Sequence, residues 1–314
     1  MSKDEILKAI EEKYEKLGVP LNTMLEGLLH STPTTYWDYI QTDALLGLQI
    51  PRTTEKDEMV FIMYHQVNEL LFKMILWEID QISLSTKEIT AKKFSKHLMR
   101  ISRYFDMLCS SFSVMGDGMD VDQYLKFRNT LAPASGFQSA QYRMIEIYST
   151  SMENMVHHTK RDQYSSKNSI EELYEEIYWK QGATEKNTGE KTLTLKQFEH
   201  RYTPRLLRIA NEVKKSTIYH KYLQLPEESK NNKDLIKALK ALDINANVNW
   251  PLMHMGSAYR YLHKEKETVE ATGGTNWKEY LPPSFQKVVF FPELYTKEEL
   301  MELLKPNIYL LFLL

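Results

Sequence analysis

Apolar residues recur every three or four positions along most of this chain, which is the spacing of one helix face rather than of a β-strand. Only 11 glycines and 11 prolines interrupt its 314 residues, so long segments remain unbroken. The pattern predicts an all-α fold. The predicted helices span Asp4–Lys16, Tyr36–Leu48, Glu58–Ser83, Ala91–Phe112, Asp120–Leu131, Gln138–Ser149, Ser169–Gln181, Leu195–Tyr202, Pro204–Val213, Lys233–Ala241, Pro251–Thr268 and Thr296–Leu304.

The connections between these helices contain no stretch rich enough in Pro, Gly or Ser to separate independent domains. No repeat of solenoid length is evident either. We therefore expect a single helical domain over residues 1–314. Residues 157–169, 182–192 and 226–234 are polar and rich in turn formers, so the region of about 150–250 is expected to be the more polar and solvent-exposed part.

The composition fits a protein with a sizeable core and no bias toward charged partners. Hydrophobic residues make up 42% of the chain, and 40 basic residues stand against 42 acidic ones for a net charge of −2. No overall field favours nucleic acid or an anionic membrane, and we expect neither as a partner. A single cysteine, Cys109, excludes an intramolecular disulfide and ordinary attachment of haem through two thioether bonds.

The sequence predicts a cytoplasmic protein. The first residues form a charged amphipathic pattern without the apolar centre and cleavage site of a signal peptide. The most apolar run, 59–82, is long enough to span a bilayer, but His65, Glu69, Lys73, Glu78 and Asp80 are distributed along it. Since each charge buried in lipid costs several kcal/mol, we expect a buried helix of a soluble protein.

That run contains the first polar group with possible chemistry. Phe61 and His65 are four residues apart, so a helix places the ring and the imidazole on one face. His65 and Glu69 have the same spacing and could bind one metal ion, but no second carboxylate-rich helix is present. An ordinary core histidine bonded to a neighbour is the alternative interpretation.

A second group follows in 120–146. Tyr124 and Arg128 share a helix face, Leu131 continues it, and the helix should stop before Pro133. The turn after it brings the Ser135 hydroxyl close to the guanidinium, and such a set of donors suits a small carboxylate. The alternative is a surface arginine paired with a nearby acid.

A third group lies in 249–275. His254 is surrounded in sequence by aliphatic and thioether side chains, which suits an axial ligand of haem iron and equally an ordinary core position. Thr272, Gly273 and Gly274 can adopt unusual backbone angles and could form a lid, or simply cap the preceding helix.

These segments resemble the tryptophan 2,3-dioxygenase family. The resemblance implies a helical cytoplasmic homotetramer that binds haem b without a covalent bond. It also implies insertion of both atoms of O2 across the indole C2=C3 bond of L-tryptophan, giving N-formylkynurenine. The similar segments are Thr34–Gln49, Phe61–Asp80, Tyr124–Glu146, Trp250–His254, Thr272–Gly274 and Phe290–Tyr295, of which the second and third are the most specific.

The resemblance also implies a role for each residue of the three groups. His254 is similar to the single protein ligand of the iron, and His65 to the distal histidine that meets the indole N–H. Arg128 corresponds to the residue that binds the substrate carboxylate, and Thr272 to the lid residue near its ammonium.

The remaining matched positions surround these four. Phe61, Tyr124 and Leu131 are similar to pocket walls, and Ser135 and Gly136 to a turn beside a haem propionate. Tyr36, Tyr39 and Ile40 correspond to a segment in an N-terminal arm, about 1–50, that reaches into the pocket of a neighbouring subunit.

The chain departs from the family pattern at positions near the proximal histidine and the lid. Leu71 stands where the family usually has Trp, Met253 and Met255–Gly256 replace basic residues, and Thr275–Asn276–Trp277 follow the lid glycines. The alternative function is therefore a related monooxygenase or hydroxylase acting on a tryptophan derivative or another aromatic amino acid. A helical haem-binding protein without turnover, and a metal-dependent oxygenase, are more distant alternatives.

Overall fold

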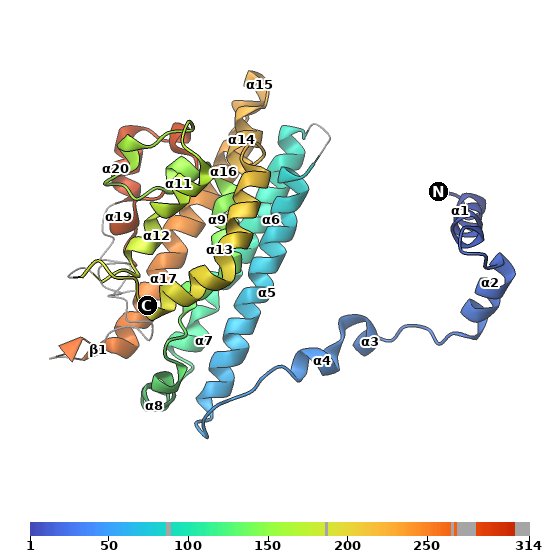
Figure 1. Cartoon of the computed structure of the whole chain (residues 1–314), viewed down its shortest axis with the longest axis horizontal. Coiled ribbons are helices and arrows are strands. Elements are labelled where there is room, and N and C mark those ends of the chain that lie inside the picture. Colours follow the sequence, from blue (N-terminus) through green and yellow to red (C-terminus); the bar gives the residue numbers. More distant parts are fainter. Residues whose placement is uncertain (86–88, 186–187, 265–266, 269–280, 305–314) are drawn as a thin grey trace. The chain divides into compact units, whose positions relative to one another are not determined.

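The computed structural model describes residues 1–85, 89–185, 188–264, 267–268 and 281–304. It divides into two compact units, Met1–Gln49 and Ile50–Leu314 (Figure 1). Helices make up both, which confirms the predicted all-α class. Within the described ranges, the strands are β1 (His263–Lys264) and β2 (Glu267–Thr268), which pair as one short antiparallel hairpin.

The first unit contains α1 (Lys3–Glu15), α2 (Leu21–His30), α3 (Tyr36–Ile40) and α4 (Thr42–Leu46). The predicted helix 36–48 is two helices, because Gln41 between them has a φ of 60° and cannot continue a right-handed helix. None of the described residues 1–49 is buried. The unit has nearly the bounds of the predicted arm, and its exchange between subunits stays a prediction.

Two long helices lie side by side in the second unit. They are α5 (Asp57–Ser83) and α6 (Ala91–Ser110), which pack along each other (Figure 1). The Glu78 carboxylate on α5 is buried and accepts hydrogen bonds from His97 Nδ1 and the Arg100 guanidinium on α6, both at 2.8 Å. No helix within the described ranges is both long and apolar enough to cross a membrane. The α6 residues that face the core recur every three or four positions: Phe94, Leu98, Ile101, Phe105 and Leu108.

Further helices pack beside this pair. Helix α9 packs on α5, α13 on α9, α16 on α6, and α17 on α7. The bounds of the helical segments after α6 are α7 Phe112–Gly116, α8 Val121–Leu131, η1 Gly136–Gln138, α9 Ala140–Ser149, α10 Met152–Met155, η2 Arg161–Gln163, α11 Ile170–Glu175, α12 Tyr178–Gln181, α13 Leu193–Val213, α14 Ile218–Leu223, α15 Glu227–Lys230, α16 Lys233–Ile244, the π-helical turn η3 Asn245–Asn249, α17 Trp250–Leu262, α19 Pro283–Gln286, η4 Pro292–Leu294 and α20 Lys297–Leu303.

Two predicted helix boundaries are wrong. Residues 195–213 form one helix through Pro204, because side chains on both sides of the proline are buried and its own position is exposed, where water can satisfy the carbonyl that loses a donor. The helix predicted for 251–268 ends at Leu262. Residues 263–268 contain no apolar side chain that could hold a helix against the protein, and β1 and β2 lie there instead.

The predicted helix 169–181 is also divided, into α11 and α12. The His157 amide donates to the Glu176 carbonyl at 2.8 Å, and Val156 pairs with Ile177 as an isolated bridge. The backbone groups at 176–177 therefore bond to another segment rather than to their own helix.

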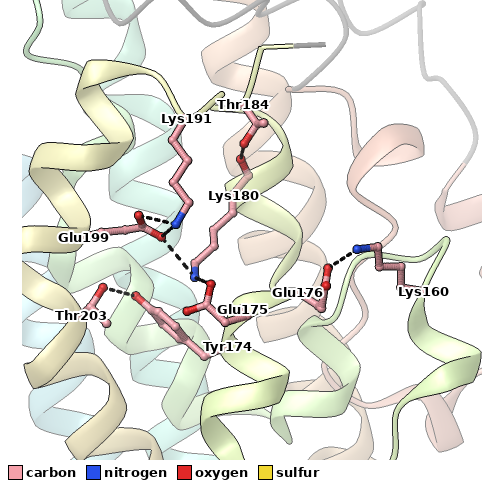
Figure 2. A network of polar contacts seen from close by, with 9 residues as sticks. All are labelled: Lys160, Tyr174, Glu175, Glu176, Lys180, Thr184, Lys191, Glu199 and Thr203. Atoms are coloured by element: carbon pink, nitrogen blue, oxygen red, sulfur yellow. Dashed lines mark hydrogen bonds and ion pairs between the residues drawn. The ribbon is translucent and has the colours of Figure 1, made fainter. Parts of the chain in front are cut away.

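Much of the region 150–250 is less exposed than expected, because it buries charges in pairs. Lys180 on α12 is 4% exposed, and its Nζ lies 3.1 Å from a Glu175 oxygen and 3.2 Å from a Glu199 oxygen on α13 (Figure 2). Lys191 binds the same Glu199 carboxylate at 2.7 Å. Through Glu199, these ion pairs attach α12 and the polar segment that follows it to α13.

Candidate functional site

His65 lies on α5 in an aromatic setting. Its Nδ1 is 2.8 Å from the carbonyl oxygen of Phe61, one turn earlier, and the two rings have their centroids 4.1 Å apart. Burial lowers the pKa of His65 below its ordinary value, against opposing effects of the Phe61 carbonyl and of the Glu69 charge. The imidazole is therefore neutral at pH 7.

His254 on α17 repeats this local geometry. Its Nδ1 is 3.2 Å from the carbonyl oxygen of Trp250, again one turn earlier, and its ring lies 4.5 Å from the Trp250 ring and 4.8 Å from that of Phe112. Burial lowers the pKa of His254 to about 4, although the Trp250 carbonyl opposes it, and the charges of His65 and Arg143 lower it further.

The two contacts determine the tautomer of each ring. A backbone carbonyl can only accept, so Nδ1 must carry the proton in both histidines. In a neutral imidazole, Nε2 then has a free lone pair on the side of the ring away from the carbonyl. Each helix thus presents one nitrogen that can bind a metal or accept a hydrogen bond.

Tertiary packing connects these two histidines through a pair of aromatic rings. Tyr64 lies 5.3 Å from His65 and 5.9 Å from Phe112, which in turn contacts His254. The electrostatic effect of His65 on His254 agrees with this proximity. Helices α5, α7 and α17 therefore bring together two residues that are far apart in sequence.

Neither histidine is fully buried. Protein atoms desolvate both rings, yet each ring keeps part of its surface accessible, as do Phe61, Tyr124 and Leu131. The neighbours of the two rings are largely aromatic. Such a partly accessible aromatic surface suits contact with a flat or aromatic guest.

Helix α8 brings an aromatic ring close to Phe61 and carries a buried arginine one turn later. It ends at Leu131, before Pro133 as predicted. Tyr124 has its ring 6.1 Å from that of Phe61 and 4.5 Å from that of Tyr261 on α17. Arg128, one turn after Tyr124, is 5% exposed, so the alternative of a surface ion pair is wrong.

The turn after α8 is fixed in place by short-range bonds. The Ser135 hydroxyl accepts from the Phe137 amide at 3.4 Å, and the Gln138 side chain accepts from the Ser135 amide at 3.3 Å. Thr194 on α13 donates to the Pro133 carbonyl at 2.8 Å. A Cβ on Gly136 would meet no heavy atom within 4 Å among the described residues, so the turn borders open space.

The family model described as tryptophan 2,3-dioxygenase matches residues 26–208, more than half of the chain. The chain belongs to the tryptophan 2,3-dioxygenase family.

Individual relatives match over a shorter stretch. Tryptophan 2,3-dioxygenase of Ruegeria sp. (strain TM1040) is 40% identical over 112 residues, which is 36% of this chain and 40% of the relative. The proteins of that name from Bacillus thuringiensis (strain Al Hakam) and Polaromonas naphthalenivorans (strain CJ2) are 39% identical over 112 residues and 38% identical over 117. The chain thus matches about two fifths of the length of these tryptophan 2,3-dioxygenases.

The family match contains the residues of α5, α8 and the following turn but stops before α17. The proposed role of His254 is therefore supported by its contacts in the structure and not by the family match. Its neighbours Met253 and Met255, which depart from the tryptophan 2,3-dioxygenase pattern, are half-buried on α17, and Leu71 is buried on α5. Thr275, Asn276 and Trp277 lie outside the described residues.

The structure does not relate four other predicted site residues to these histidines. Thr272 lies outside the described residues. Tyr36, Tyr39 and Ile40 belong to the first unit and are exposed there.

In the second unit, the Glu69 carboxylate accepts a hydrogen bond from Gln141 at 2.7 Å. Its contribution to the site is the electrostatic effect on His65 described above.

Sequence reasoning missed Phe112 and the buried charge of Arg143. Arg143 on α9 donates to Glu146 at 2.8 Å and to the Tyr178 hydroxyl at 3.2 Å, and Tyr178 also donates to Glu146. Arg143 lies within a segment similar to tryptophan 2,3-dioxygenase, but spacing along α9 gives no sign of its proximity to His254, which arises from tertiary packing.

Proposed function

We propose that this protein is a haem-dependent dioxygenase that inserts O2 across the indole C2=C3 bond of L-tryptophan and forms N-formylkynurenine. The observation that carries the proposal is the pair of neutral imidazoles from α5 and α17, each with Nδ1 bonded to its own helix and Nε2 free to face a guest. Family membership and the names of the relatives support the same reaction.

The residues present fit a haem with one protein ligand. His254 offers the Nε2 lone pair, and burial together with the charge of Arg143 keeps that nitrogen unprotonated. The turn at Ser135 and Gly136, with open space beside it, would lie next to a propionate. A single cysteine excludes attachment through two thioether bonds, and the family resemblance implies haem b bound without a covalent bond. When bound, haem supplies the iron at which O2 reacts.

The other residues bind and orient the amino acid. His65 Nε2 accepts the indole N–H, because its own proton is on Nδ1. Arg128 holds the carboxylate through two charge-assisted hydrogen bonds. The apolar surfaces of Phe61, Tyr124 and Leu131 enclose the ring and exclude water, and the family resemblance assigns binding of the ammonium to Thr272. These contacts hold the bound indole in one orientation, so that reaction does not depend on random collision. This positioning is the main contribution expected of the protein.

We further propose a cytoplasmic homotetramer with neither nucleic acid nor membrane as partner. The first unit exposes apolar side chains, among them Leu28, Leu29 and Leu46, which a second surface would cover. A neighbouring subunit would supply that surface, and Tyr36, Tyr39 and Ile40 would complete its pocket. An isolated monomer should then be inactive.

The direct test is turnover by the full chain loaded with haem, reduced, and mixed with L-tryptophan and air. The expected product has gained two oxygen atoms and absorbs in the near ultraviolet as N-formylkynurenine does. A product that has gained one oxygen atom would replace this proposal with the hydroxylase alternative. Haem uptake without any oxidation of tryptophan or a derivative would refute the proposal that the protein is an enzyme.

A second test addresses the iron ligand. His254→Ala should lose haem during purification and show no Soret band, while His200→Ala, which removes an exposed histidine from α13, should keep both. Equal haem content and identical Soret spectra in the two variants would rule out His254 as the ligand.

A further inference from the structure

The helix that carries His254 begins with an unusual turn. Residues Asn245–Asn249 form a π-helical turn between α16 and α17. Such a turn accommodates one more residue than an α-helical turn, is rare, and often lies near functional sites. Each residue of an α-helix rotates the chain by about 100°. If this turn relaxed to α-helix, α17 would rotate by roughly that angle and His254 would face another direction.

Asp243, in the last turn of α16, binds this π-turn from within the core. Its carboxylate is fully buried. Oδ1 accepts from Asn247 Nδ2 at 2.7 Å and from the Phe290 amide at 3.0 Å, and Oδ2 accepts from the Phe291 amide at 3.3 Å. One carboxylate therefore connects α16, the π-turn and the segment before η4.

Two other bonds hold the same turn from neighbouring helices. The Tyr142 hydroxyl on α9 donates to the Ala246 carbonyl at 2.7 Å, in a fully buried contact. Asn245 Nδ2 donates to the Ser102 hydroxyl on α6 at 3.0 Å. The turn is thus fixed by three surrounding segments rather than by its own backbone alone.

The end of this turn is coupled to His254 directly. Trp250, the first residue of α17, provides the carbonyl that binds His254 Nδ1, and its indole packs on Phe72 of α5 at 5.5 Å. A change in the turn would move that carbonyl and the imidazole together.

We propose that Asp243 is a positioning residue that holds the π-turn in place, so that Trp250 and His254 keep their contacts with Phe72 and Phe112. The inference rests on the proposed function, because it gives His254 its role as iron ligand. Asp243 itself touches neither substrate nor cofactor.

The experiment uses Asp243→Asn in the full chain. Both carboxylate oxygens of Asp243 accept hydrogen bonds from N–H groups. In asparagine an NH2 group replaces one of these oxygens, so in either orientation of the amide an N–H donor faces another donor. We expect haem to bind roughly ten- to a hundredfold more weakly, as when other residues behind a metal ligand are changed. In the reduced protein, the iron–histidine stretching band in the resonance Raman spectrum should shift or disappear. Asp234→Asn, an exposed position on the same helix, is the matched control and should change neither.

Tyr142→Phe provides a second variant that deletes a single hydrogen bond to the turn. If Asp243→Asn fails to fold, as judged by circular dichroism of the haem-free protein, a shifted iron–histidine band in Tyr142→Phe supports the inference and an unchanged band overturns it. Parent-like affinity and band position in folded Asp243→Asn also overturn it.

The parent protein separates this inference from the proposed function. Absence of an iron–histidine band in the haem-loaded parent refutes the ligand role of His254 and everything built on it. A normal parent band with no effect of the Asp243 and Tyr142 variants refutes only the positioning role.

Discussion

The low pKa of His254 predicts how the stability of the haem-free protein depends on pH. Above pH 6.5, the folded and unfolded chains both hold this imidazole neutral. Below that value, the unfolded chain binds a proton at His254, while the folded chain does so only near its own pKa of about 4. Proton binding therefore stabilises the unfolded state, and stability is lost as the pH falls from 6.5 to about 4.

The magnitude follows from the difference between the two values. An ordinary pKa of 6.5 and a folded one of about 4, at about 1.4 kcal/mol per pH unit, give about 3 kcal/mol in total. Roughly 2 kcal/mol of this should be lost by pH 5, where the fold is still expected to persist. His65 adds a loss of the same sign, because burial also lowers its pKa.

Urea denaturation of the parent and of His254→Leu, both without haem, isolates this effect. Leucine cannot titrate, so the parent should lose stability relative to the variant as the pH is lowered from 7 to 5. Comparing the two proteins at each pH cancels the contributions of distant groups that titrate in both. A difference in unfolding free energy that stays constant within about 0.5 kcal/mol over this range would show that His254 is solvated in the folded protein, and the reasoning on its tautomer and setting would fail.

Two other predictions concern charged side chains. Arg128→Leu should weaken binding of L-tryptophan by about 3 kcal/mol, or about a hundredfold, while tryptamine, which lacks the carboxylate, should bind as it does to the parent; equal losses for both ligands would contradict the proposed role. Glu199→Gln removes one of the two carboxylates beside the buried Lys180 ammonium and should lower the unfolding free energy by about 2 kcal/mol. The exposed counterpart Glu212→Gln should change it by less than about 0.5 kcal/mol, and an equally small effect of Glu199→Gln would show that the buried network contributes little.

Periodicity predicted the long helices well, because each of them buries one apolar face. Helices α5 and α6 were expected within two residues of their observed ends. The expected break at Pro204 was wrong because packing on both sides of the proline outweighs the loss of one exposed hydrogen bond. Short elements such as α10 and α14 contain too few residues for a periodic pattern to be visible.

The site was predictable only in pieces. Spacing of four placed Phe61 with His65 and Tyr124 with Arg128, since those relations lie within single helices. The approach of His65 to His254 depends on the packing of α5, α7 and α17, and the ring of Phe112 that connects them is one apolar residue among many in the sequence. The π-turn was not foreseen either, because the bonds that hold it come from α6, α9 and Asp243 on α16.

The surroundings of the two histidines also argue for which of them binds the iron. They share the same local contact, so the Nδ1 bond does not distinguish them. Arg143 adds a positive charge near His254 and disfavours its protonation, which suits a nitrogen that must keep its lone pair for a metal. Glu69 adds a negative charge near His65, which makes Nε2 of that ring a stronger hydrogen-bond acceptor, as contact with an indole N–H requires. In the proposed function, these charges favour metal binding by His254 and substrate orientation by His65. On this argument, removing the Glu69 charge should affect tryptophan binding more than haem binding.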